Sequence, residues 1–304
     1  MLFISPSKAN DIENYQLPIS KLTLELEFAD ESAKPIKQKL ISLVDLYISE
    51  ATELFGGPPK KLNGDAYTRL RIKISKNGFG GEADPEFIEL RDVSERKLFG
   101  FYGWEIGLLH ETLHLWSAET FRYVDDQEQW FNEGVTEYLT FRLATKLGIL
   151  KKDQILNAFS TPIGNYLSAK GISEHSLRSA ARTKKLKKEH YFLVYHGGFV
   201  AGMILDHQIR SRSKGEFTLD DLMRELYRTH SRDNRYSSDS ILKLMNTSMN
   251  IDFSAFFERH IDGNEIIPVG DYFDMGQLML SEIGAPIDGE DQKILADMLN
   301  LNDS

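Results

Sequence analysis

The strongest constraint on the fold is a change in hydrophobic spacing near Gly103. Beyond this residue, apolar side chains recur at helical intervals over residues 103–118, 128–147, 152–168, 190–211, 218–230, 238–247 and 252–260. Such spacing predicts amphipathic helices that each bury one face. The second part of the chain is therefore expected to be almost entirely helical.

The part before Gly103 carries strand patterns instead. Residues 20–28 and 67–74 alternate apolar and polar side chains, which predicts strands with one buried face. Residues 34–55 between them show helical spacing that ends at a Gly-Gly-Pro-Pro stop. A glycine-rich turn at residues 77–81 leads into a third candidate strand at residues 86–90. We expect a small mixed sheet.

These patterns predict an α+β fold in two lobes. A chain of 304 residues is long enough for two lobes of ordinary domain size. We expect a sheet-bearing N-terminal lobe over residues 1–118, which includes the first long helix, and a mainly helical C-terminal lobe over residues 119–304. Because we find no flexible linker between them, the two lobes are expected to form one functional unit.

The charge of the chain narrows its range of partners. Its formal net charge of -10 disfavours nucleic acid and anionic membranes, which both bind cationic surfaces. Residues 178–188 form a local basic run, which we interpret as a solvated helix face or loop. With no predicted signal peptide or membrane span, we expect a cytoplasmic protein.

The absence of cysteine leaves imidazole and carboxylate as the strong metal ligands. His110 and His114 are four residues apart in a helical segment, so both rings lie on one helix face. Glu111 follows the first histidine, at a position that suits the general base of a zinc hydrolase. A chance match to so short a pattern is the alternative.

A third ligand is predicted at Glu133, which follows His114 after a gap of eighteen residues and lies in a second helical segment. Two histidines and one glutamate are an established ligand set for hydrolytic zinc, with the fourth position left for water. The alternative is that Glu133 merely interacts with the dipole of its helix. Asp125 and Asp126 are weaker ligand candidates, because they lie in a turn where helix caps are common.

Glu137 lies one helical turn after Glu133, on the same face. It is in a position to accept the remaining ring N–H of a ligand histidine and so to fix the tautomer of that ring. A solvent-exposed glutamate is the alternative, and the pattern does not decide between the two.

The residues described so far resemble a known group. His-Glu-x-x-His, eighteen residues and then a glutamate within Trp-x-x-Glu-Gly are similar to the gluzincin metallopeptidases of the thermolysin-like clan, above all the glycyl aminopeptidases and next the aminopeptidase N family. Later segments extend the likeness to the glycyl aminopeptidases, to about residues 78–280. They are Tyr195-His196-Gly197-Gly198, Leu205-Asp206, Ile209-Arg210, the run from Thr218 to Met223, Asp252-Phe253, Phe256-Phe257, Ile261-Asp262-Gly263 and Pro268.

The resemblance implies a thermolysin-like catalytic domain in which Tyr195 donates a hydrogen bond to the oxyanion. A neutral phenol can do so without repelling the metal. The residues alone favour a core tyrosine on an amphipathic helix over a catalytic one. The chain departs from the family at Gly197, where a lysine is usual. His190, Tyr191 and His196 flank Tyr195, and such histidines are more often hydrogen-bonded within the structure than catalytic.

The same resemblance implies a glycine-rich strand whose glutamate binds the free amino group of the substrate. Its nearest match is Gly80-Gly81-Glu82, which makes Gly81 and Glu82 candidate substrate-binding residues. This segment lacks the usual residue between glycine and glutamate, so Glu82 as a simple turn residue is the alternative. The part of the chain before the catalytic domain is also shorter than in those families.

The favoured interpretation is zinc-dependent peptide hydrolysis, of aminopeptidase type, with one zinc ion as cofactor and a peptide or protein as substrate. The alternative is an inactive peptidase-like module that binds peptides or proteins. The sequence leaves open the choice between aminopeptidase and endopeptidase, the side-chain preference and the oligomeric state.

Overall fold

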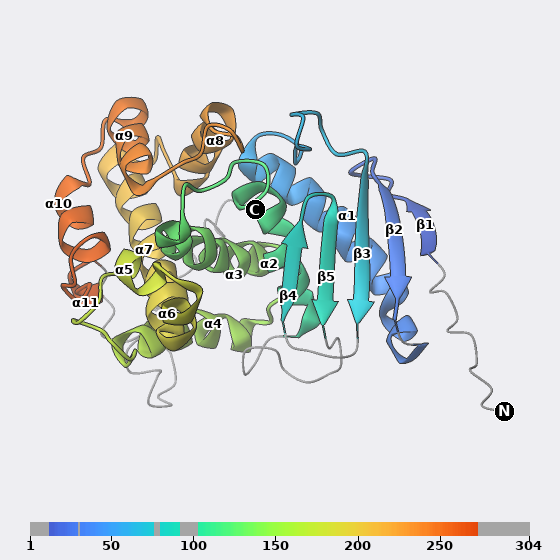
Figure 1. The fold of residues 1–304 in the computed structure, drawn as a ribbon, viewed down its shortest axis with the longest axis horizontal. Coiled ribbons are helices and arrows are strands. Elements are labelled where there is room, and N and C mark those ends of the chain that lie inside the picture. Colours follow the sequence, from blue (N-terminus) through green and yellow to red (C-terminus); the bar gives the residue numbers. More distant parts are fainter. Residues whose placement is uncertain (1–11, 30, 76–79, 92–102, 273–304) are drawn as a thin grey trace. The chain divides into compact units, whose positions relative to one another are not determined.

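The computed structural model describes residues 12–29, 31–75, 80–91 and 103–272 (Figure 1). The chain divides into two compact units, Met1–Glu53 with Gly57–Leu115, and Leu54–Gly56 with Trp116–Ser304. The lobe boundary expected at residue 118 stays a prediction. Within each unit, the structure shows how the described elements are built.

A five-stranded sheet forms the first unit, in the order β1-β2-β3-β5-β4. The inner strands β2, β3 and β5 run parallel, whereas β1 and β4 pair antiparallel at the two edges. The strands are β1 (Ile12–Gln16), β2 (Thr23–Phe28), β3 (Arg69–Ser75), β4 (Gly81–Asp84) and β5 (Phe87–Arg91).

The apolar face of this sheet and the apolar side chains of helix α1 (Lys37–Phe55) are buried. Helix α1 follows the 3₁₀ helix η1 (Glu31–Ile36) and runs across the sheet in Figure 1. The register pairs Leu24 with Leu70 and Ile72 with Ile88, so apolar side chains share one face. The buried Asp45 of α1 accepts hydrogen bonds from the backbone of the β1–β2 turn, which ties helix to sheet.

Charged side chains occupy the other face of the sheet. Arg71 pairs with Glu27 at 2.6 Å, and Lys73 pairs with Glu89 at 3.3 Å, each across neighbouring strands. Opposite charges on adjacent strands stabilise the pairing and keep the face polar. The strict alternation predicted from residues 67–74 is thereby confirmed in β3.

Helix α2 (Trp104–Ser117) completes the first unit. The Oη of Tyr47 in α1 donates to the carbonyl of Glu105 at 3.3 Å, and Lys39 pairs with the Glu105 carboxylate at 2.6 Å. These contacts attach the start of α2 to α1.

The second unit is helical throughout the residues described. Its elements are η2 (Asp126–Glu128), η3 (Trp130–Val135), α3 (Thr136–Lys146), α4 (Lys152–Leu167), α5 (Leu177–Ala181), α6 (Lys184–Glu189), α7 (Tyr191–Ser213), α8 (Leu219–Thr229), α9 (Ser238–Met249), α10 (Ser254–Phe256), η4 (Phe257–Ile261) and α11 (Val269–Tyr272).

Helix α7 is the central element of this unit, and it is buried along most of its length. Phe199 of α7 packs against Tyr138 of α3 and Phe159 of α4, with ring centroids 5.7 and 5.8 Å apart. Edge-on aromatic packing of this kind supplies much buried apolar surface. The core of the second unit therefore lies where α3, α4 and α7 meet.

A buried ionic network joins α3, α7 and α8 through Asp206. Its carboxylate accepts hydrogen bonds from Tyr138 at 2.7 Å and Arg142 at 2.8 Å, and from Arg210 at 3.0 Å. The backbone N–H of Leu219 donates to it as well. Burial alone would raise the pKa of Asp206, but Arg142 and Arg210 outweigh this and hold the pKa below its ordinary value.

The fold agrees with the expected mixture of a small sheet and a mainly helical remainder. The predicted strands and long helices are all present, with shifted ends. Strands β1 and β4 were not predicted, nor were the short helices α5, α6 and α11. The helix expected over residues 128–147 is interrupted, because residues 130–135 form a π-helix before α3 begins.

Among the described residues, no helix combines the length and the apolar character needed to cross a membrane.

Candidate metal centre

Helix α2 brings the two predicted histidine ligands together. The Nε2 atoms of His110 and His114 lie 3.0 Å apart, and the rings meet edge to face. His114 is only 6% exposed and His110 is half-buried. The spacing of four residues puts both rings on one face of the helix, one turn apart, as the sequence predicts.

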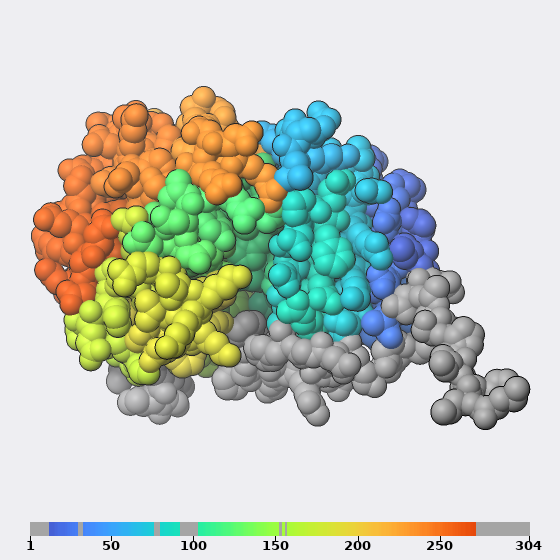
Figure 2. Space-filling model, viewed as in Figure 1, coloured from blue at the N-terminus to red at the C-terminus, as the bar shows by residue number. Residues whose placement is uncertain are grey.

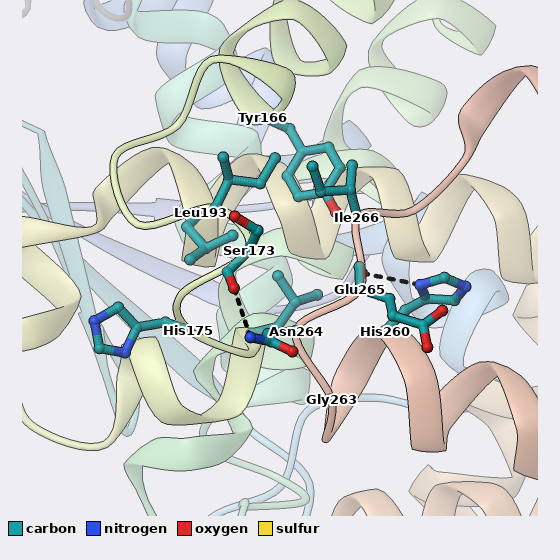
Figure 3. Close-up of a pocket in the computed structure, with 11 residues that line it drawn as sticks. Tyr166, Ser173, His175, Leu193, His260, Gly263, Asn264, Glu265 and Ile266 are labelled. Carbon is teal, nitrogen blue, oxygen red and sulfur yellow. Dashed lines mark hydrogen bonds between the residues drawn. The ribbon is translucent and has the colours of Figure 1, made fainter.

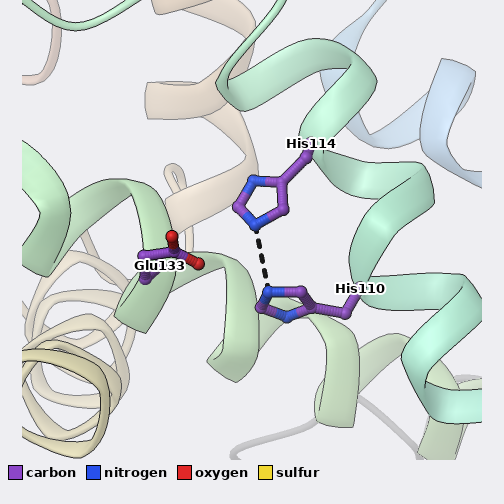
Figure 4. Close-up of side chains that lie close together, drawn as sticks. All are labelled: His110, His114 and Glu133. Atoms are coloured by element: carbon purple, nitrogen blue, oxygen red, sulfur yellow. Dashed lines mark hydrogen bonds between the residues drawn. The ribbon is translucent and has the colours of Figure 1, made fainter. Parts of the chain in front are cut away.

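Glu133 supplies the third donor. One nitrogen from each histidine and one carboxylate oxygen of Glu133 all lie within 4.8 Å of one another (Figure 4). No other group of three or more histidine, aspartate or glutamate donors was found in the part of the chain that the structure describes. Two imidazoles and one carboxylate suit zinc, so the residues present fit the metal that the sequence predicts.

The π-helix η3 determines how Glu133 is presented. Its apolar residues Trp130, Phe131 and Val135 are buried, and Trp130 Nε1 donates to the Ser238 hydroxyl of α9 at 3.2 Å. Extra residues in a π turn rotate the side chains that follow, and such turns occur often at functional sites. Glu133 is thus held on a widened turn whose other side chains anchor it in the core.

Two glycines let α7 approach this turn. A Cβ added to Gly198 would collide with the Trp130 carbonyl oxygen, and one added to Gly134 would collide with Gly198. The backbone of Tyr195 also lies against Gly134, since a Cβ there would be 2.6 Å from the Tyr195 carbonyl oxygen. Tyr195, the predicted oxyanion donor, therefore lies on the segment of α7 that crosses η3 beside Glu133.

Lys187 contacts Glu133 directly. Its Nζ lies 2.6 Å from Glu133 Oε1 and 2.9 Å from Gln129 Oε1, and 5.1 Å from the centre of the Tyr195 ring. The ammonium group is therefore attracted by a carboxylate and by an aromatic face at once. Sequence reasoning placed Lys187 only in a solvated basic run, because nothing in local spacing indicates a partner 54 positions away.

Glu111, the predicted general base, is 9% exposed and lies against strand β4 within the first unit. A Cβ added to Gly81 would lie 2.5 Å from Glu111 Cγ and 2.7 Å from Glu111 Oε1. Only a residue without a side chain leaves room for Glu111 in this position. Gly81 is thus structurally connected to the predicted base, a relationship that sequence analysis did not foresee.

Glu82 points the other way. It is opposite Glu89 in the sheet, on the charged face, and its carboxylate pairs with Arg91 at 2.5 Å. Neighbouring residues of a strand project to opposite faces, so Glu82 and the contact of Gly81 with Glu111 lie on different sides of β4. An amine-binding role for Glu82 stays a prediction.

Glu137 is buried, at 7% exposure, so it is not the solvent-exposed glutamate of the alternative interpretation. Its Oε1 lies 3.6 Å from Nε2 of His196 on α7. Burial raises the pKa of Tyr191, and the charges of Glu137 and Glu133 raise it further. Whether Glu137 also orients a ligand histidine stays a prediction.

The remaining candidates are accounted for by local structure. Asp125 caps η2 by accepting a hydrogen bond from the backbone N–H of Gln127 at 2.8 Å, so it acts as a helix cap, the alternative to a metal ligand. His190 Nδ1 lies 2.9 Å from the Lys170 carbonyl oxygen. A Cβ added to Gly197 would lie 2.6 Å from Leu177 Cδ2, so the position of the usual family lysine is filled by packing from α5.

A small cavity in the second unit is lined by none of the predicted metal-binding, catalytic or substrate-binding residues (Figure 3). Its polar atoms are engaged with each other: Asn264 Nδ2 donates to the Ser173 carbonyl at 2.5 Å, and His260 Nδ1 lies 3.0 Å from the Glu265 carbonyl. The Oη of Tyr166 accepts the backbone N–H of Ile267 at 2.9 Å. We assign no function to this cavity.

Comparison with known families matches the segment that holds this site. The family model of the M61 glycyl aminopeptidases matches residues 107–196, a range that contains all three metal donors and Tyr195. The chain resembles the glycyl aminopeptidases. The resemblance predicted from the sequence motifs is thereby confirmed over this range.

Solved structures show the same fold at low identity. An aminopeptidase N family protein from Idiomarina loihiensis matches with a TM-score of 0.70 and 17% identity, over 88% of this chain and 49% of the other. A variant M1 zinc metallopeptidase from Deinococcus radiodurans, solved with a Tyr-Ser-Ala substrate, matches with a TM-score of 0.60 and 13% identity, over 85% and 53%. Yeast LTA4 hydrolase with bestatin matches with a TM-score of 0.58 and 14% identity, over 85% and 40%.

The chain spans about half the length of the first solved structures that it matches. Among curated proteins, no sequence matches it. At identities below 20% the structural likeness shows the fold alone.

Proposed function

We propose that this chain is a zinc-dependent peptidase with a thermolysin-like catalytic domain, in which His110, His114 and Glu133 hold one zinc ion. The observation that carries the proposal is the convergence of these three donors within 4.8 Å, inside the segment that matches the glycyl aminopeptidases. A bound zinc ion supplies Lewis acidity, which lowers the pKa of water and polarises a peptide carbonyl.

Glu111 is the proposed general base. It follows the first ligand histidine in α2, and its low exposure removes competing water from its carboxylate. In this role Glu111 takes a proton from the attacking water and delivers it to the leaving amine, as one carboxylate can do in sequence. Gly81 supports this role by leaving space for the side chain.

Tyr195 is the proposed donor to the oxyanion. Its ring stacks on Tyr191 with centroids 4.2 Å apart, and Lys187 lies over it at 5.1 Å. These contacts restrict the ring, and a restricted donor stabilises developing charge without first having to reorient.

Peptides are the proposed substrates, and aminopeptidase-type cleavage is the favoured mode because the resemblance is to aminopeptidases. A second candidate is a module that binds peptides without cleaving them. Gly197 favours it, since the packing of Leu177 leaves no room there for the lysine usual in the family. The presence of three metal donors together with Glu111 favours the enzyme.

The decisive experiment combines metal analysis with cleavage of a peptide library that carries free or acetylated N-termini. We expect about one zinc ion per chain and cleavage that acetylation suppresses. Glu111→Gln should keep the zinc and lose cleavage, whereas Glu105→Gln, on the same helix, should keep both. Cleavage that survives Glu111→Gln contradicts the mechanism, and retention of peptides without products supports the binding module.

A further inference from the structure

Helix α6 is a basic element that the proposed mechanism uses at one position only. Four of its six residues are lysines, in a chain whose net charge is -10. Lys184, Lys185 and Lys188 are exposed, and Figure 2 shows this segment, drawn yellow, on the surface of the viewed face. We call these three residues the basic α6 surface.

Compensation within the basic α6 surface is weak, because Lys185 interacts electrostatically with Glu189 without forming an ion pair with it. Within the described part of the chain, none of its three lysines lies within ion-pairing distance of a carboxylate, and the one acid of α6, Glu189, pairs with Lys170 at 2.6 Å. Lys184 and Lys188 are one turn apart, so they repel each other. Lys184 and Lys185 also lie in the first turn, where the helix dipole disfavours cations.

The same helix reaches the candidate metal centre. Its fourth lysine, Lys187, bonds to Glu133 at 2.6 Å within the second unit, and the Thr183 hydroxyl caps the helix start by accepting the Leu186 N–H at 3.2 Å. Every residue of one such short helix lies within about two turns of Lys187. Three exposed cations thus share one short helix with Lys187, which pairs with a predicted zinc ligand.

We propose that the basic α6 surface binds acidic side chains of the peptide substrate and makes the enzyme selective for acidic peptides. This deepens the proposed function and rests on it. Lys184, Lys185 and Lys188 attract carboxylates on the same helix whose Lys187 pairs with Glu133. Electrostatic steering of this type raises the association rate of oppositely charged ligands and weakens with salt.

Phe192 lies in the first turn of α7, just after α6 in the chain. It follows Lys188 by four residues, is 45% exposed, and stacks on His196 with ring centroids 5.0 Å apart. Cations beside an exposed ring also occur in proteins that bind nucleic acid. We favour a peptide, because three cations on a chain of net charge -10 neutralise too few phosphates for strong nucleic-acid binding.

The test uses the zinc-loaded Glu111→Gln protein and two fluorescent peptides of equal length, one with four glutamates and one with four glutamines in their place. Binding is measured by fluorescence anisotropy, with a single-stranded oligonucleotide as a third ligand. We expect the glutamate peptide to bind about tenfold more tightly at low salt. The preference should vanish when Lys184, Lys185 and Lys188 are all replaced by Glu.

The matched control is the replacement of Lys151, Lys214 and Lys243 by Glu, which changes the charge equally at exposed sites outside α6 and should keep the preference. Equal binding of both peptides, a preference that survives the α6 replacements, or tighter binding of the oligonucleotide overturns the proposal. Cleavage of the neutral peptide by the unaltered protein is measured in parallel. If the unaltered protein does not cleave the neutral peptide, the peptidase function is refuted. The binding preference for the glutamate peptide still tests the role of the basic α6 surface.

Discussion

Gly134 and Gly198 face each other where the π-helix η3 crosses α7, so closely that neither position has space for a Cβ. The crossing brings the segment that carries Glu133 against the segment that carries Tyr195. Backbones approach to this distance only when side chains are absent from both surfaces. The spacing of two proposed functional residues therefore depends on a contact between two glycines.

Gly198→Ala should separate the two helices. We expect a loss of stability of about 1–3 kcal/mol, the range typical of overpacking, together with weaker zinc binding because Glu133 moves with η3. Thermal unfolding and zinc titration measure the two effects. Gly202→Ala is the control on the same helix, where the nearest atom to an added Cβ is Val135 Cγ2 at 3.2 Å. Equal effects of both substitutions contradict the special role of the crossing.

Gly81→Ala should displace the Glu111 side chain, because the added Cβ would lie 2.5 Å from Glu111 Cγ. We expect peptidase activity to fall about tenfold to a hundredfold, since a base that shifts by about 1 Å loses its alignment, while zinc content stays unchanged. Steady-state kinetics and metal analysis check this. Gly270→Ala, which adds a methyl group in open space, should leave both readouts unchanged. If Gly81→Ala keeps full activity, the position of Glu111 does not matter for the reaction, and the prediction is wrong.

Lys187→Met removes the cation that pairs with Glu133 at 2.6 Å. A metal ion and an ammonium group compete for one carboxylate, so zinc should bind about threefold to tenfold more tightly to the variant. The zinc-free variant should unfold at a lower temperature, because Glu133 and Gln129 lose their donor. Competition with a chelator and thermal unfolding without metal give the two readouts, and Lys188→Met is the control. Weaker zinc binding in Lys187→Met shows that the lysine orients the carboxylate instead of competing for it.

Asp206→Asn removes the buried carboxylate that Arg142 and Arg210 share, and leaves Arg142 with Asp220 as its partner. Removing one partner of such a pair costs about 3–5 kcal/mol. Burial would raise the pKa of Asp206, but the two arginines lower it overall, so its stabilising contribution is fully present above the ordinary value of 3.8 and is lost as the pH falls through the lower folded value. Urea unfolding between about pH 3 and pH 7 should show a stability difference that is constant above pH 5 and shrinks at the acid end.

Asp233→Asn, at an exposed position, is the control for the pH series and should change stability little at any pH. A difference between wild type and Asp206→Asn that stays constant down to pH 3 would mean that the charge of Asp206 is not what stabilises the network.

Features with a local signature were predictable from the sequence. Alternation over residues 67–74 predicted β3, and helical spacing over residues 103–118 predicted α2 with His110 and His114 on one face. Strands β1 and β4 were missed because they are short edge strands, which are stabilised by pairing with a neighbour more than by their own pattern. The π-helix was missed because its residues also fit ordinary helical spacing.

The sequence by itself determined the mixture of a small sheet and long helices, and it predicted the donor set of His110, His114 and Glu133, because residue type and spacing along the chain carry both signals. Only the tertiary structure decided that Gly81 makes room for Glu111, that Gly134 meets Gly198, and that Lys187 pairs with Glu133. Each of these contacts joins residues far apart along the chain. Their partners are chosen by how the elements pack, and no local periodicity records that choice.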